Sequence, residues 1–148
     1  MEEVKIGVIA CLHGNIKNAE QLVSKFKKLK VDAIVLNGDI PSDSNQYNNL
    51  IKILGIFTKS NIKILLQPGS HEHYLDYTKA VKKFKNKIIN CFQIRKYNLN
   101  GYNLAFLSGS DVQPKDSGFK ILKNRDSSNK WFAHRRKYKV HLTKPIKL

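Results

Sequence analysis

Apolar and polar positions follow two different patterns along the first 111 residues. Nearly continuous apolar runs, typical of strands buried on both faces, cover residues 4–10, 33–36 and 62–66. Elsewhere apolar residues recur every three or four positions, which predicts amphipathic helices from Asn15 to about Lys28 and from about Ser44 onward. Strands that alternate with helices predict right-handed crossovers and a parallel sheet. The pattern therefore predicts an α/β fold.

The segment that follows the third strand predicts smaller elements. A shorter helix is expected near Thr78–Lys85, and Ile88 with Ile89 is expected to add an edge strand. Residues 93–99 and 102–107 flank an Asn-Gly pair, which is a strong hairpin signal.

Polar side chains follow each of the three main strands. The carboxyl ends of parallel strands share one edge of a sheet, here called the rim, and ligands bind there. Metal-capable and polar groups are therefore expected to converge at the rim. The three loops that reach it are Cys11-Leu12-His13-Gly14-Asn15, Asn37-Gly38-Asp39 and Pro68-Gly69-Ser70-His71-Glu72.

These loops, in this order, resemble the D-x-H-G-N, G-D and G-N-H-[DE] motifs of the calcineurin-like metallophosphoesterases, over residues 4–111. The resemblance implies a four-layer α/β sandwich and a two-metal centre that activates a hydroxide for attack on phosphorus. It places His13 at a first-metal position and Asp39 at the position that bridges the two metals. It also places His71 at the position that assists the leaving group, with the acidic Glu72 beside it.

The departures from the family pattern concern the metal ligands. Cys11 replaces the first aspartate, and Ser70 replaces the asparagine that binds the second metal. Neither His134 nor His141 lies in the family's distal G-H-x-H motif. The second metal would keep only Asp39, so two-metal hydrolysis is expected to be lost. No cofactor is expected, or at most one zinc ion on Cys11, His13 and Asp39, since these three residue types all bind zinc.

Net charge divides the chain near residue 111. Residues 1–111 carry 16 basic and 9 acidic side chains, whereas residues 112–148 carry 11 basic and only 2 acidic ones. We therefore expect a metallophosphoesterase-like domain at 1–111 and a basic C-terminal extension at 112–148. The total of +16 indicates a polyanionic partner, with nucleic acid favoured over an anionic membrane surface and a merely solubilising surface as the plain alternative.

The extension interleaves basic and aromatic residues. Lysine and arginine neutralise phosphates, and exposed rings stack on unpaired bases, so the extension is expected to contact RNA. Alternatively, its aromatic residues fold back onto the sheet. The candidate RNA-binding residues are Lys120, Lys123, Arg125, Lys130, Trp131, Arg135, Arg136, Lys137 and Lys139.

An incomplete sandwich is a further expectation. Only the hairpin at 93–107 is available to begin the second sheet, so one face of the main sheet should be poorly covered and should need a partner. The high positive charge makes a homo-oligomer an unlikely cover.

The sequence contains no apolar run long enough to span a membrane and no signal-peptide pattern at its start, so a cytoplasmic location is expected. Cys11 and Cys91 are expected to be free thiols.

Three hypotheses follow. The first is a pseudoenzyme that binds RNA, as a component of the ribosome or another ribonucleoprotein, beside ribosomal RNA and neighbouring proteins. The second is a surviving metal-dependent phosphoesterase with Asp39 and His13 on metal and His71 as general acid. The third is an altered gene product whose last 37 residues have no selected role.

Overall fold

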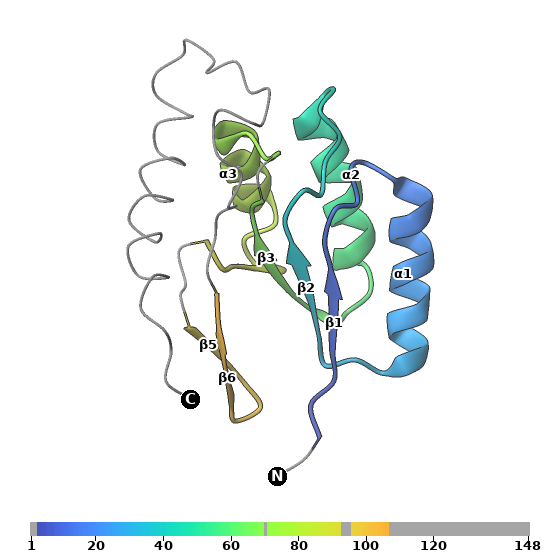
Figure 1. Cartoon of the computed structure of the whole chain (residues 1–148), viewed down its shortest axis with the longest axis vertical. Helices are drawn as coiled ribbons and strands as arrows, with labels where there is room; N and C mark the ends of the chain where they lie inside the picture. Colours follow the sequence, from blue (N-terminus) through green and yellow to red (C-terminus); the bar gives the residue numbers. More distant parts are fainter. Residues whose placement is uncertain (1–2, 70, 93–95, 107–148) are drawn as a thin grey trace, which may run out of the picture.

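The computed structural model describes residues 3–69, 71–92 and 96–106, which form two sheets and three helices (Figure 1). Four parallel strands make the main sheet, in the order β1-β2-β3-β4. The α/β class and the parallel sheet with flanking helices are confirmed. The strands of the main sheet are β1 (Ile6–Ile9), β2 (Ala33–Asn37), β3 (Lys63–Gln67) and β4 (Ile88–Asn90).

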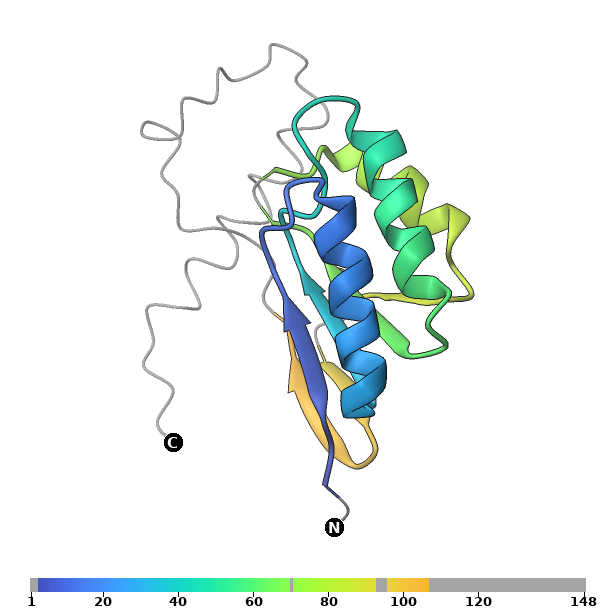
Figure 2. The same cartoon turned by 90° about the vertical axis from the view of Figure 1, so that its right-hand side faces the viewer.

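The helices follow the first three strands and all cover the same face of the sheet (Figure 2). Sequential strand order with right-handed crossovers requires this one-sided arrangement. The opposite face carries an antiparallel hairpin of two further strands. The helices are α1 (Ile16–Leu29), α2 (Gln46–Thr58) and α3 (Tyr74–Lys83), and the hairpin strands are β5 (Lys96–Leu99) and β6 (Tyr102–Ala105).

Successive side chains of the central strands point to opposite faces of the sheet, so they contribute to two apolar clusters. Ile34 and Leu36 of β2 point toward the helices and join the larger cluster. Ala33 and Val35 point the other way and pack with hairpin residues, including the fully buried Leu99. The sheet is thus the middle of three layers.

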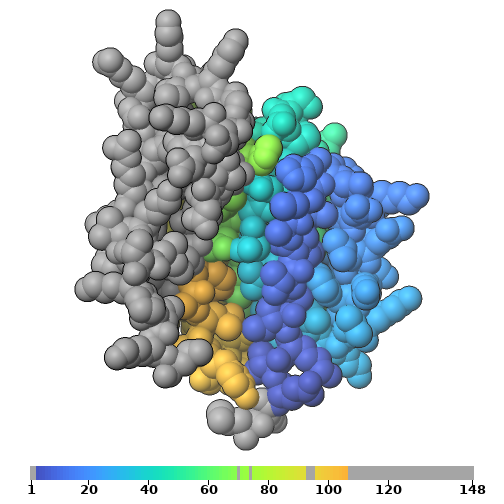
Figure 3. All heavy atoms as spheres, in the orientation of Figure 1, coloured from blue at the N-terminus to red at the C-terminus, as the bar shows by residue number. Residues whose placement is uncertain are grey.

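The face under the hairpin is only partly covered among the described residues. The first strand was predicted to be buried on both faces, but Val8 of β1 is 63% exposed. The reason is position, because β1 is an edge strand. Figure 3 shows β1 at the surface beside the hairpin.

The helix boundaries reflect local side-chain contacts. Asn15 caps α1 as predicted, and its side chain accepts a hydrogen bond from Asn18 N at 2.9 Å. Helix α3 begins four residues earlier than predicted because Tyr77 is a buried anchor, with its hydroxyl 2.7 Å from Asn90 Oδ1. Burial holds the pKa of Tyr77 well above its usual range.

The predicted hairpin is confirmed within residues 96–106. Asn100 and Gly101 both have positive φ, 49° and 90°, as a type I′ turn requires. No helix in the described part of the chain has the length and apolar character needed to cross a bilayer. The predicted boundary at 111 and the extension at 112–148 lie outside the described residues.

Candidate functional site

Backbone hydrogen bonds join the first two rim loops. Cys11 N donates to Gly38 O at 3.1 Å, and His13 N donates to Asp39 O at 3.0 Å. Gly38, with φ +81°, lies against Gly69 of the third loop so closely that any β-carbon would collide with the Gly69 backbone. The sequence therefore brings the three loops together as predicted, and the glycines allow their close approach.

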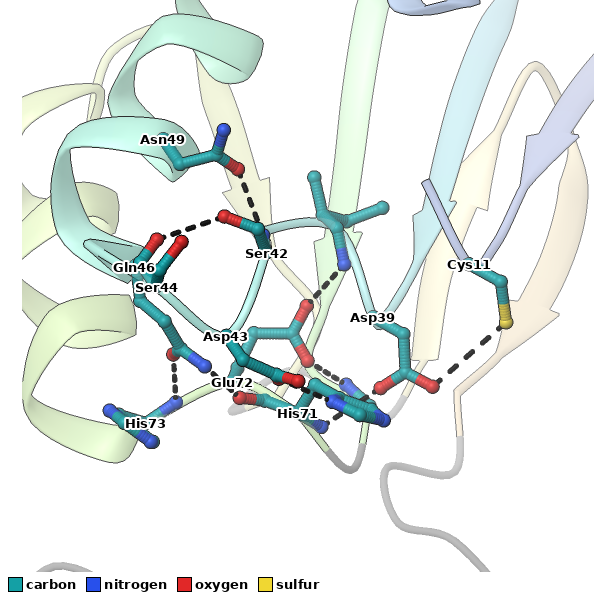
Figure 4. Close-up of polar contacts among 12 residues, drawn as sticks. Cys11, Asp39, Ser42, Asp43, Ser44, Gln46, Asn49, His71, Glu72 and His73 are labelled. Atoms are coloured by element: carbon teal, nitrogen blue, oxygen red, sulfur yellow. Dashed lines mark hydrogen bonds and ion pairs between the residues drawn. The ribbon is translucent and has the colours of Figure 1, made fainter. Parts of the chain in front are cut away.

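Cys11, His13 and Asp39 form one compact group of possible metal ligands. One ligand atom from each lies within 4.8 Å of the other two, and Cys11 Sγ is 3.9 Å from Asp39 Oδ2 (Figure 4). All three residues have positive φ, at 55°, 45° and 55°. A non-glycine residue has a conformational penalty of about 1 kcal/mol there, and such residues cluster at functional sites.

The donor set suits a single zinc ion. Thiolate, imidazole and carboxylate are all zinc ligands, and three protein ligands leave a fourth position open. Within the described residues this is the only group of three or more metal-capable side chains that converges in this way. Ser70, at the family's second-metal position, lies outside those residues.

His71 is paired with a carboxylate that the sequence analysis did not single out. Its Nδ1 lies 2.8 Å from Asp43 Oδ1, and its ring packs edge-on against the His13 ring with centroids 5.0 Å apart. The contact with Asp43 raises the pKa of His71, and the contact with His71 lowers the pKa of Asp43. His71 N also donates to Asp39 Oδ1 at 2.9 Å, so His71 contacts both Asp39 and Asp43.

Glu72 is a buried connector between loops. Its Oε1 accepts from Ile40 N at 2.8 Å, and its Oε2 accepts from Gly69 N at 2.7 Å. Burial raises the pKa of Glu72, although these donors favour its charged form. Because its two carboxylate oxygens accept from backbone amides on either side of it, Glu72 connects the segment at Ile40 with the loop at Gly69.

Two side chains of α2 complete the rim. Buried Gln46 donates to His71 O at 2.6 Å and accepts from His73 N at 2.9 Å, while Asn49 accepts from Ser42 N at 3.0 Å (Figure 4). Sequence reasoning missed both because they follow no strand directly. Asp43 was missed as well. The only sign of its role in the sequence was that a second carboxylate follows Asp39 by four residues.

The predicted residues thus divide into two sets. Cys11, His13, Asp39, His71 and Glu72 converge at the rim. All nine candidate RNA-binding residues, from Lys120 to Lys139, lie outside the described part of the chain.

Comparison with known proteins shows which proteins this chain resembles in fold and in sequence. A solved structure with a similar fold is the crystal structure of TT1561 of Thermus thermophilus, with a TM-score of 0.63 and 15% identity. The match covers 74% of this chain, and this chain spans about half (51%) of that one. No curated protein sequence matches. The family model of the calcineurin-like phosphoesterases matches residues 4–144, so the chain belongs to the calcineurin-like phosphoesterase family.

Proposed function

We propose that this chain is a non-catalytic member of the phosphoesterase family that binds RNA as a component of a ribosome or another ribonucleoprotein. The observation that supports the non-catalytic part is the composition of the ligand group at the rim, where Cys11 stands in place of the family's first aspartate beside His13 and Asp39. Two-metal hydrolysis needs a second cation close to the first, to stabilise both the attacking and the leaving oxygen.

The remaining polar groups of the rim support the same conclusion. Asp39, at the bridging position, has Oδ1 bonded to the His71 amide and Oδ2 in contact with the Cys11 thiol. Glu72 has both oxygens on backbone amides. The described donor set of Cys11, His13 and Asp39 supports a single zinc ion. When bound, such an ion supplies Lewis-acid chemistry at its open position.

The RNA-binding part of the proposal is supported by charge. Lysine and arginine outnumber aspartate and glutamate by 27 to 11, a composition suited to a phosphate backbone. The extension at 112–148, with nine of the sixteen excess charges, is the proposed contact region.

A metal-dependent phosphoesterase is the competing candidate, and the His71–Asp43 pair is the observation that favours it. A histidine held 2.8 Å from a carboxylate is suited to keeping a proton for a leaving group. In this alternative His13 and Asp39 hold the metal.

Three measurements on one preparation separate the two functions. We expect at most one metal ion per chain, no hydrolysis of a generic phosphodiester or of RNA above background with Mn²⁺ or Zn²⁺, and salt-sensitive RNA binding. Two bound ions with a turnover that Asp39→Asn abolishes would establish the enzyme. Absence of RNA binding at low salt would remove the RNA-binding function.

A further inference from the structure

The described lysines gather at the end of the sheet opposite the rim. In a parallel α/β layer, helices end and strands begin at the same edge, here called the basal edge. Helices α1 and α2 bring four lysines there, in their last turns or as C-caps. They are Lys27, Lys28, Lys30 and Lys59.

Helix α3 and the strand starts add six more lysines to the basal edge. Four lie in the last turn of α3 or in the segment that leads to β4, and the others precede β1 or begin β3. They are Lys82, Lys83, Lys85, Lys87, Lys5 and Lys63. All ten basal-edge lysines are exposed.

The carboxylates at the basal edge are too few to neutralise its ten lysines. Glu3 and Asp32 are its acidic residues, and Asp32 already accepts a hydrogen bond from Lys5 N at 2.7 Å. Glu3 forms an ion pair with Lys5 at 3.9 Å. The net charge of the basal edge is therefore +8. The other described residues include five lysines and five carboxylates, whose charges cancel.

The rim carries charge of the opposite sign. Asp39, Asp43, Glu72 and Asp76 lie at or next to it, and Lys17 is the nearest lysine in sequence. Two of these carboxylates are paired with histidines, Asp43 with His71 and Asp76 with His73, and the three rim loops contain no lysine. The rim should therefore attract a polyanion less than the basal edge does.

Helix dipoles alone do not require so many lysines. A cation near a helix C-terminus contributes about 0.3–1 kcal/mol, and one or two per helix satisfy that role. Lys5 and Lys63 belong to strand starts, where the helix dipole does not act. A surface that concentrates the excess charge of the described residues is better explained by a partner.

We infer that the basal edge binds the phosphate backbone of folded RNA without reading its sequence. This inference rests on the proposed RNA-binding function and adds a second contact surface to the extension. Every described basic residue is a lysine, and lysine contacts phosphate as a point charge, whereas bidentate base recognition typically uses arginine.

The shape and chemistry of the edge favour RNA over a membrane. Helix α2 packs between α1 and α3, and the hairpin turn lies toward the same end of the molecule as the start of β1 (Figures 1 and 2). Of the large apolar side chains exposed among the described residues, Leu29 and Tyr102 lie here. Two such residues do not make a membrane-insertion face.

Two variants of the full chain with the same net charge test the surface. The basal variant replaces Lys28, Lys30, Lys83 and Lys85 with glutamine. The control variant replaces four exposed lysines elsewhere with glutamine, namely Lys17, Lys25, Lys52 and Lys79. Affinity for a short RNA duplex, and for a second duplex of scrambled sequence, is measured from 50 to 200 mM salt, and circular dichroism checks folding.

The basal variant should lose about three units of the slope of log affinity against log salt, because each phosphate contact contributes about 0.7–0.9. Its affinity should therefore fall about 60-fold less across this salt range than that of the wild type. The control variant should keep the wild-type slope, as should arginine at the four basal positions. Both duplexes should bind equally well.

The outcomes separate a failure of the basal-edge inference from a failure of the proposed RNA-binding function. If the wild type binds RNA and the basal variant keeps its slope, or loses no more than the control, the basal edge is not the contact surface, although RNA binding stands. If the wild type binds phosphatidylserine vesicles and not RNA, both the inference and the proposed function fail.

Discussion

At the residue scale, the two cysteines have opposite surroundings. Cys11 is exposed at the rim, whereas Cys91 is 1% exposed under the hairpin. Burial raises the pKa of Cys91 to about 12, so its thiol stays protonated at neutral pH, and the thiolate is the reactive form. This difference depends on where each cysteine lies in the fold, which the spacing of the two cysteines in the sequence does not reveal.

A thiol reagent at pH 8 should therefore modify one cysteine per folded chain quickly and the second only after denaturation. Mass spectrometry of the labelled protein identifies the site as Cys11. The Cys11→Ser variant serves as control and should show no fast reaction. Rapid labelling of Cys91 in the folded protein would contradict the buried environment described for it.

At the element scale, the sequence predicted the strands and the convergence of the three loops well. Strand ends in a parallel sheet have a fixed geometry, so Cys11, His13 and Asp39 could be placed together from their order alone. The partner of His71 could not be predicted, because Asp43 reaches it through the path of the loop after β2. The start of α3 was missed because Tyr77 is anchored by tertiary contacts, which override local propensity.

The Glu72 connection between loops should make a measurable contribution to stability. Glu72→Gln replaces one acceptor oxygen with an amide donor that faces a backbone N–H, so the free energy of unfolding should fall by about 1–3 kcal/mol. Urea unfolding measures this change. Glu20→Gln, on the exposed side of α1, is the matched control and should change it by less than about 0.5 kcal/mol. Equal stability of the two variants would mean that the loop connection contributes little.

At the scale of the whole molecule, charge and site chemistry lie at opposite ends. The rim holds the ligand group and most of the described carboxylates, while the basal edge holds the unbalanced lysines. The sequence revealed the size of the excess charge, but only the topology shows that helix ends and strand starts place the excess of the described residues, +8, at one edge. In this family fold the lysine-rich edge faces away from the rim, as the proposed binding function requires.

Sedimentation of the full chain in a cell extract tests the central claim most directly. A non-catalytic RNA-binding protein of a ribonucleoprotein should enter the heavy fractions of a sucrose gradient at low salt. It should move to the light fractions after ribonuclease treatment or at high salt, because phosphate contacts weaken as salt rises. A chain that stays in the light fractions at low salt, with or without ribonuclease, would contradict the account.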